Sequence, residues 1–291
     1  MKNISKPKVV SEIGCNHMGE FEKAKELIRL SKEAGAGYVK FQKRNNKELL
    51  TTEQYNSPHP VPNNSYGETY GAHRDFLEFN VDQHKELKDY CENIGIVYST
   101  SVWDITSAKE IVGLNPEFIK VPSACNNHFE MLEILRDNYS KQIQLSVGMT
   151  TENEIEEIVQ FFEEKNQAKD RLLIYSCTSG YPVPPKDVCL LEILKLQQRY
   201  SNRVSEIGFS GHHNGIALDI AAYTLGAVWI ERHFTKDRTW KGTDHAASLE
   251  PNGLRKLVRD LNSTYLALNY KPSEILEIEN VQREKLKYRK Q

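Results

Sequence analysis

Two histidines, His212 and His233, stand at the ends of short apolar runs that follow each other along the chain. The runs 206–212 and 228–234 predict neighbouring parallel strands, so the two imidazoles would meet at one edge of a sheet. Two imidazoles there can share a divalent ion and leave positions for water and substrate. Because no third histidine or cysteine joins them, we expect a weakly held Mn²⁺ or Mg²⁺. The alternative is that each histidine is a hydrogen-bonded structural residue.

Two lysines lie inside apolar runs, Lys40 in YVKFQ and Lys120 in FIKVP. A surface lysine would extend along the protein to water, but the strands of a closed barrel have no wide solvent face. Hydroxyl side chains stand near the ends of other predicted strands: Thr100, Ser123, Ser146, Thr178 and Ser210. Two cations and several hydroxyls together predict a pocket for phosphate and carboxylate groups.

Glu12 ends the first predicted strand, and Asp244 follows the last one in the loop WKGTDHAAS. Closure of a barrel would place these strands side by side, so the two carboxylates could carry a proton and bind a sugar hydroxyl. For Asp244 the alternative is an ordinary turn residue after a glycine. Gln42 and Tyr181 also stand at strand ends and are expected to contact the substrate.

Four other histidines are expected to lie outside this site. Side chains alternate along a strand, so His213 is expected to point away from His212. His59, His84 and His128 are expected at the surface.

Eight short apolar runs alternate with amphipathic helical patterns, which is typical of βαβ units and a parallel sheet. The predicted strands are 8–14, 38–43, 97–101, 118–123, 142–148, 172–178, 206–212 and 228–234. Eight units predict a closed (β/α)8 barrel, whose catalytic groups gather at the carboxyl ends of the strands. A doubly wound open sheet is the alternative, but no GxGxxG sequence follows the first strand.

The interval between the second and third strands is unusually long because of residues 44–80. This insertion is rich in proline, tyrosine and basic residues, and its position predicts a lid at the catalytic face. Residues 1–268 are expected to form the barrel. The charge-rich residues 269–291 are expected to form a tail or linker without a core of its own.

The 38 Lys and Arg residues nearly balance the 40 Asp and Glu residues, and the net charge is −2, which argues against binding to nucleic acid through overall charge. Hydrophobic residues at 39% and charged residues at 27% are typical of a folded globular protein. The longest apolar stretch, 215–230, contains Asp219 and is too short to span a bilayer, so no membrane association is expected. Five cysteines without CxxC spacing, and an N-terminus without an apolar signal core, predict a cytoplasmic protein.

Taken in order, several motifs resemble those of the sialic acid synthase family, which makes N-acetylneuraminate or N-acylneuraminate 9-phosphate. The matching segments are SEIGCNHMG (11–19), AGAGYVKFQ (34–42), SYGETYGAHRDFLEF (65–79), KVPSACNN (120–127), SVGM (146–149), CTSGYP (177–182), GFSGHHNG (208–215), ERHFT (231–235) and KGTDHAASLEP (241–251). The likeness covers nearly the whole chain.

The resemblance implies condensation of phosphoenolpyruvate with N-acetylmannosamine or its 6-phosphate, with release of phosphate. It assigns His212 and His233 to the metal, and it assigns the phosphoenolpyruvate pocket to Lys40, Thr100, Lys120, Ser123, Ser146 and Ser210. It also implies that the amino sugar is bound by Glu12, Gln42, Tyr181 and Asp244. It also implies a homodimer.

The chain departs from the family pattern at two places. An acidic residue that follows the Gly-Ser-Gly motif of many relatives is missing from Pro122-Ser123-Ala124-Cys125, so another group must take any acid–base role it has. Most relatives continue into a small antifreeze-like C-terminal domain, which contacts the N-acyl group in the partner's site, and we expect this chain to lack it.

Three other functions remain open at this stage. A related barrel could condense phosphoenolpyruvate with a different aldose to make a deoxy-ketulosonate. A Schiff-base aldolase could use Lys40 or Lys120 as its nucleophile. A non-catalytic barrel could bind a sugar or a partner chain.

Overall fold

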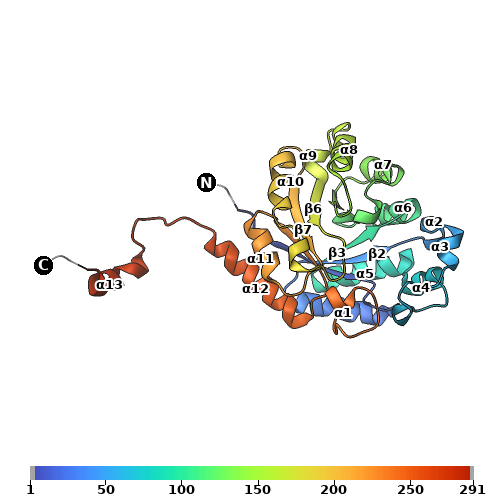
Figure 1. Cartoon of the computed structure of the whole chain (residues 1–291), viewed down its shortest axis with the longest axis horizontal. Coiled ribbons are helices and arrows are strands. Elements are labelled where there is room, and N and C mark those ends of the chain that lie inside the picture. The colour runs from blue at the N-terminus through green and yellow to red at the C-terminus, as the bar shows by residue number, and fades with distance from the viewer. Residues whose placement is uncertain (1–3, 289–291) are drawn as a thin grey trace.

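Eight parallel strands close into a barrel in the computed structural model, which describes residues 4–288 (Figure 1). The strands are β1 (Lys8–Gly14), β2 (Tyr38–Lys43), β3 (Val97–Val102), β4 (Phe118–Val121), β5 (Gln142–Ser146), β6 (Leu172–Cys177), β7 (Glu206–Gly211) and β8 (Trp229–His233). Each strand pairs with the next in the chain, and β8 pairs with β1. The predicted barrel is confirmed, and every strand lies within two residues of its expected limits.

Helices follow the strands and cover the outside of the barrel. They are α1 (Phe21–Glu33), α5 (Val81–Ile94), α6 (Ile105–Leu114), α7 (Phe129–Asn138), α8 (Glu152–Glu163), α10 (Glu192–Tyr200), α11 (Ala217–Thr224) and α12 (Pro251–Ala267). Short elements α9 (Ala168–Arg171), η2 (Ser123–Cys125), η3 (Pro185–Asp187) and η4 (His245–Ala247) lie in the connections. Polar side chains begin several helices, such as Asn80, which accepts a hydrogen bond from the Gln83 N–H. The main hydrophobic core fills the layer between these helices and the strands.

The strand register determines which side chains enter the barrel. Glu12 lies opposite Lys40 on β2 and opposite His233 on β8, so these three residues share one level of the interior. Residues two positions earlier on the same strands lie one level deeper, because side chains alternate between the two faces. At the amino ends of the strands the interior is closed by an apolar cluster: Val10, Phe118, Leu173, Tyr175 and Trp229. The polar level therefore rests on a packed floor.

The insertion after β2 is folded. It contains α2 (Asn46–Leu49), α3 (Thr52–Asn56), η1 (Pro62–Asn64) and α4 (Tyr70–Leu77), which lie together at one end of the barrel (Figure 1). Gly71 allows α4 to approach α3, because a Cβ at Gly71 would lie 2.3 Å from the ring of Tyr55. Close packing between these two short helices holds α4 at the barrel mouth.

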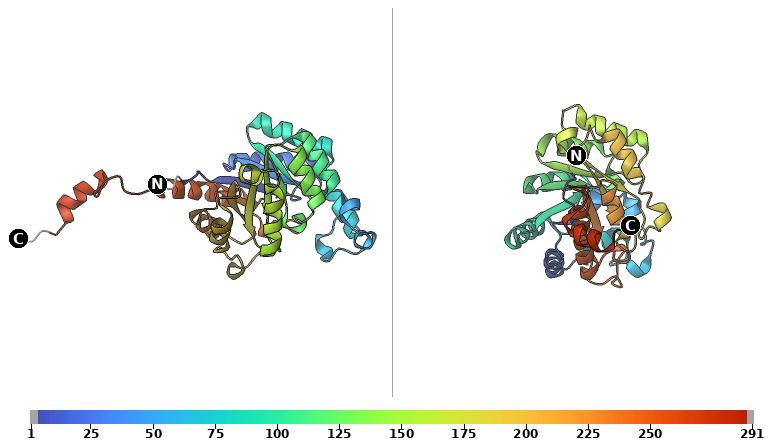
Figure 2. Two further views of the ribbon diagram at one scale, coloured as in Figure 1. Left: turned by 90° about the horizontal axis from the view of Figure 1, so that it is seen from above. Right: turned by 90° about the vertical axis from the view of Figure 1, so that its left-hand side faces the viewer.

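The chain leaves the barrel after α12. An extended segment leads to α13 (Glu277–Leu286), which lies apart from the barrel (Figure 1 and the left-hand view of Figure 2). Several apolar side chains of this part, among them Tyr270, Ile278 and Leu286, are largely exposed. No helix within residues 4–288 is both long enough and apolar enough to cross a membrane.

Gly208 on β7 makes room for a large ring in the barrel floor. A Cβ at this position would lie 2.6 Å from the ring of Tyr175 and 3.1 Å from the carbonyl oxygen of Trp229. We expect Gly208→Ala to lower the free energy of unfolding by about 1–3 kcal/mol through overpacking. Gly113→Ala is the control, since nothing lies within 4 Å of its Cβ position. Chemical denaturation measures both variants, and equal stability of the two would contradict this packing argument.

Candidate active site

The carboxyl ends of the strands surround a cavity of about 540 Å³. Its wall contains all of the site residues expected from the sequence except Thr100 and Thr178: Glu12, Lys40, Gln42, Lys120, Ser123, Ser146, Tyr181, Ser210, His212, His233 and Asp244. The structure thus brings residues from all eight strands and their following loops to one place. A cavity at this end of a barrel is where catalytic groups are found in enzymes of this fold.

Two lysines and two glutamates alternate at the bottom of the cavity. The Lys120 Nζ donates to Glu231 Oε1 and Oε2 at 2.9 and 3.0 Å, and the Lys40 Nζ lies 3.9 Å from Glu231 Oε2. Lys40 also pairs with Glu12 and donates to the Ser101 Oγ at 2.8 Å. All four charged side chains are almost completely buried. Each cation therefore has a counter-ion, which is the condition for burying a charge at acceptable free energy.

The pKa values of these groups separate because of their surroundings. Burial alone would raise the pKa of Glu231, but Lys120 and Lys40 lower it to about 2. Burial raises the pKa of Glu12, although Lys40 and His233 oppose the increase. Burial likewise lowers the pKa of Lys120 against the attraction of Glu231. Glu231 is thus a permanent anion, whereas Glu12 is the carboxyl group better suited to exchange a proton.

The imidazoles of His212 and His233 face each other with their ring centres 5.3 Å apart. The His212 Nδ1 lies 3.0 Å from the Thr178 carbonyl oxygen, which can only accept, so Nδ1 carries the proton and Nε2 keeps its lone pair. Burial and the neighbouring His233 lower the pKa of His212 to about 3, which keeps its ring neutral. The buried His233 Nδ1 has no hydrogen-bond partner among the described residues. The Nε2 lone pair of His212 beside the unpartnered Nδ1 of His233 fits a shared divalent ion.

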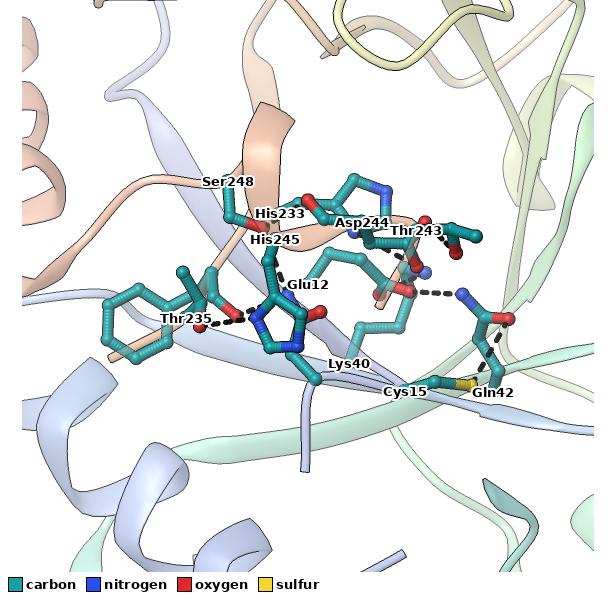
Figure 3. Close-up of polar contacts among 12 residues, drawn as sticks. Glu12, Cys15, Lys40, Gln42, His233, Thr235, Thr243, Asp244, His245 and Ser248 are labelled. Carbon is teal, nitrogen blue, oxygen red and sulfur yellow. Dashed lines mark hydrogen bonds and ion pairs between the residues drawn. The ribbon is translucent and has the colours of Figure 1, made fainter. Parts of the chain in front are cut away.

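Asp244 is held beside His233 by a well-anchored loop (Figure 3). Its Oδ2 lies 3.9 Å from the His233 Nδ1, and His233 lowers its pKa although burial opposes this. The loop is fixed because the Ser248 Oγ donates to the Asp244 carbonyl at 2.8 Å and the Thr235 Oγ1 lies 2.7 Å from the His245 Nδ1. Asp244 is therefore a positioned side chain and not only a turn residue.

Two more of the expected residues complete the wall near the imidazoles. The Gln42 Nε2 donates to Glu12 Oε1 at 3.2 Å. The ring of Tyr181 packs on His212 at 4.4 Å and edge-on to His233 at 5.8 Å, and half of its surface is exposed. Tyr181 thus separates the two imidazoles from solvent on one side.

Backbone and hydroxyl groups line the side of the cavity near the lysines. The Ser210 Oγ donates to Glu231 Oε1 at 2.9 Å, and the Ser123 Oγ accepts from the Gly148 N–H at 2.9 Å. A Cβ at Gly148 would lie 2.7 Å from the Ser179 Oγ, so glycine lets this backbone approach the serines closely. These small groups leave room for an anion above the lysines.

Two expected site residues do not line the cavity. Thr100 lies opposite Phe41 and Ile119, whose side chains pack against the helices, so its hydroxyl faces the helix layer. Its neighbour Ser101 faces the cavity instead, because side chains alternate along β3. The Thr178 Oγ1 donates to the Asp187 carbonyl at 2.9 Å, so Thr178 contributes only its own carbonyl to His212.

The predicted positions of the other histidines are confirmed in one case and wrong in two. His213 turns away from the cavity, as expected, and lies 3.3 Å from Asp219. The prediction that His59 and His84 are surface residues is wrong. His84 is completely buried with its Nδ1 2.6 Å from the Tyr98 hydroxyl, and His59 is buried in the cavity wall.

Several cavity residues were not found from the sequence. Glu231, Ser101 and Cys177 each line the cavity, and strand alternation counted from His233 would have found Glu231. Three further cavity residues, Arg44, Trp103 and Arg74, belong to the loops and the insertion. There the sequence has no periodic pattern that would indicate which way a side chain points. The segment 122–124 brings no carboxylate to the wall, so the carboxylates of this cavity are Glu12, Glu231 and Asp244.

The fold and site together define a (β/α)8-barrel enzyme with two buried lysines beside two imidazoles. A family comparison agrees: the NeuB family domain matches residues 27–272, and the chain belongs to that family.

The chain is similar to the human N-acetylneuraminate-9-phosphate synthase, with 37% identity over 278 residues, which are 96% of this chain and 76% of the relative. It is 30% identical to the N,N'-diacetyllegionaminic acid synthase of Campylobacter jejuni over 91% of this chain and 78% of that one. A crystal structure of the N-acetylneuraminic acid synthetase of Leptospira borgpetersenii, in complex with citrate, superposes with a TM-score of 0.80 at 27% identity. It covers 99% of this chain and 97% of that one.

Proposed function

We propose that this enzyme condenses phosphoenolpyruvate with N-acetylmannosamine, or its 6-phosphate, to give a sialic acid-type nonulosonate and inorganic phosphate. The observation that supports this most is the placement of two buried lysines and several hydroxyls directly beside two facing imidazoles. Such a cavity can bind a small dianion next to the carbonyl group with which it reacts. The resemblance to synthases of related nonulosonates supports the same reaction class.

Phosphoenolpyruvate would occupy the lysine side of the cavity. Lys40 and Lys120 would attract its phosphate and carboxylate, while Ser123, Ser146 and Ser210 would supply hydroxyl groups to the remaining oxygens. Because Glu231 lies beside both ammonium groups and holds them in place, little reorganisation is needed when the anion binds.

The open-chain sugar would occupy the imidazole side. His212 and His233 would hold a divalent ion, Mn²⁺ or Mg²⁺, which when bound supplies Lewis acidity to the aldehyde oxygen. Gln42, Tyr181 and Asp244 would orient the sugar hydroxyl and amide groups. No group of three or more His, Cys, Asp or Glu side chains within residues 4–288 forms a complete metal cage, so water and substrate would fill the other positions.

The bond changes follow from this arrangement. C3 of phosphoenolpyruvate forms a bond to the aldehyde carbon, and the aldehyde oxygen takes up a proton. Water adds to C2 of the former enol, and phosphate then leaves with cleavage of its C–O bond. Glu12 lies between Lys40 and His233, and we assign to it the proton transfer at the aldehyde or at the water.

We further propose residues 1–268 as the catalytic barrel and 269–291 as a linker-like tail. The position of α13 apart from the barrel supports this division (Figure 2). The exposed apolar residues of α13 support the proposal that a second copy of the chain binds there. All five cysteines are free, which supports a cytoplasmic location.

Phosphate release tests the proposed function. Purified protein with phosphoenolpyruvate and Mn²⁺ is expected to release phosphate only when a mannosamine-type sugar is present, and a chelator is expected to stop release. Arabinose and erythrose phosphates test the related synthases, and borohydride trapping with pyruvate tests the Schiff-base aldolase. Release that is independent of any sugar, or a trapped covalent adduct on Lys40 or Lys120, would contradict the proposal.

A further inference from the structure

Arg74 is a partly buried cation that has no ion-pair partner among the described residues. It lies on α4 of the insertion and lines the cavity. Its Nε and Nη2 donate to the Tyr70 hydroxyl at 3.1 and 2.5 Å, while its Nη1 is buried and has no hydrogen-bond partner in the described part of the chain. No carboxylate of residues 4–288 lies within ion-pair distance of Arg74. Burying a charged nitrogen such as this Nη1 without an acceptor costs free energy, and an anionic ligand would supply the missing acceptor.

Arg44 and Trp103 adjoin Arg74 in the same wall. The guanidinium carbons of Arg44 and Arg74 lie 5.5 and 5.6 Å from the centre of the Trp103 ring. The indole Nε1 of Trp103 is buried and also has no hydrogen-bond partner in the described structure. Arg44 pairs with Glu78, the one carboxylate bonded to this pair of arginines in residues 4–288. The cluster therefore has one positive charge and at least two N–H donors in excess.

His73 adds a further donor to the cluster. Its Nδ1 accepts a hydrogen bond from the Tyr66 N–H at 3.0 Å, so in the neutral ring the proton is on Nε2. Burial and the nearby cationic groups lower the pKa of His73 to about 4, so it remains neutral at physiological pH. Burial and the charge of Arg44 also lower the pKa of Arg74. An anion placed here would relieve this repulsion.

The cluster lies at the outer end of the cavity whose inner end holds the lysines. Arg44 follows Lys40 by four residues of nearly extended chain, so its Cα lies roughly 13 Å further along the strand direction. An open-chain hexose spans about 9 Å from its aldehyde carbon to a phosphorus atom on O6. A sugar with its aldehyde beside the imidazoles can therefore extend its far end towards the arginines.

We propose that Arg44, Arg74, Trp103 and His73 form a binding site for a phosphate monoester, and that the sugar substrate is therefore the 6-phosphate and not the free sugar. This inference rests on the proposed function and specifies which form of the sugar is its substrate. Arg74 supplies the unpaired charge, and Arg44 and the neutral donors complete the set. A free sugar would leave the Arg74 Nη1 and the Trp103 Nε1 unpaired, which disfavours its binding.

Steady-state kinetics with N-acetylmannosamine 6-phosphate and N-acetylmannosamine test the proposal. The wild-type enzyme is expected to prefer the phosphorylated sugar in kcat/KM by about 10- to 150-fold, the effect of one charge-assisted hydrogen bond. Arg74→Leu is expected to remove most of this preference, mainly through KM for the sugar phosphate, with KM for phosphoenolpyruvate little changed. Arg74→Lys should keep part of it, because the charge remains.

Arg255→Leu on α12 is the matched control, since Arg255 is exposed and lies outside the cavity wall. Calorimetric titration with each sugar gives a second readout that does not need turnover. If the free sugar reacts as well as its phosphate, the condensing function stands and the phosphate site is refuted. If neither sugar reacts but the phosphorylated one binds and Arg74→Leu abolishes binding, the phosphate site stands and the function fails. If inorganic phosphate competes with phosphoenolpyruvate but not with the sugar phosphate, anion binding lies at the lysines only, which would contradict the proposal.

Discussion

Lys120→Met is expected to lower kcat/KM for phosphoenolpyruvate by about 10²- to 10³-fold, the range for removing one fixed electrostatic contact from an active site. The same change is expected to lower the free energy of unfolding by about 3–5 kcal/mol, because it leaves Glu231 as a buried anion with only Lys40 nearby, at 3.9 Å. Phosphate-release kinetics and urea denaturation measure the two effects.

The double variant Lys120→Met/Glu231→Leu separates catalysis from stability. Removing both charges is expected to restore much of the stability, since an apolar pair of similar volume needs no ion-pair partner. Activity is expected to remain low, because the anion pocket still lacks one ammonium group. Recovery of activity in the double variant would show that Lys120 acts only as a counter-ion for Glu231.

The pH dependence of stability gives a further check on this ion pair. In the wild-type protein the pKa of Glu231 is lowered to about 2, so its stabilising contribution is complete above the unfolded value near 4.5 and declines as the pH falls towards 2. In Lys120→Met the carboxyl group loses its main partner and takes up a proton at higher pH. The stability difference between the two proteins is therefore expected to be smaller at pH 4 than at pH 7.

Most of the fold was predictable because its pattern is local. Eight β-rich runs separated by amphipathic stretches require a parallel sheet, and the polar residue at each strand end indicates which edge carries the site. Strand alternation explains both the success at Lys40 and His233 and the error at Thr100. Thr100 was chosen for its chemistry near a strand end, whereas its inward-facing neighbour, Ser101, receives the hydrogen bond from Lys40.

The insertion was harder to predict for a physical reason. Its position after a strand indicated that it lies at the catalytic face, but short helices such as α4 have too few turns for a periodic pattern. His59 and Arg74 are polar residues in a proline-rich stretch, which usually means exposure. The burial of His59 and the partial burial of Arg74 depend on contacts with Tyr70 and with Trp103, and Trp103 follows a different strand.

Loss of the ring nitrogens of His212 or His233 is expected to lower turnover more than loss of any other histidine. Replacing either by alanine is expected to lower kcat by about 10³-fold or more, because each provides one of the two ring nitrogens that would hold the ion and so polarise the aldehyde. His233→Gln retains much of the volume under Tyr181 and distinguishes lost coordination from lost packing.

Titration of each variant with Mn²⁺ by calorimetry gives a binding readout that is separate from activity. Weaker Mn²⁺ binding is expected for both His233 variants, whereas His128→Ala on the outside of the cavity should bind and react as the wild type does. Because Asp244 lies 3.9 Å from His233, Asp244→Asn is expected to weaken Mn²⁺ binding less than His233→Gln does. Near-normal rates for His233→Ala in the presence of a chelator would show that the paired imidazoles serve the substrate directly and that no ion is required.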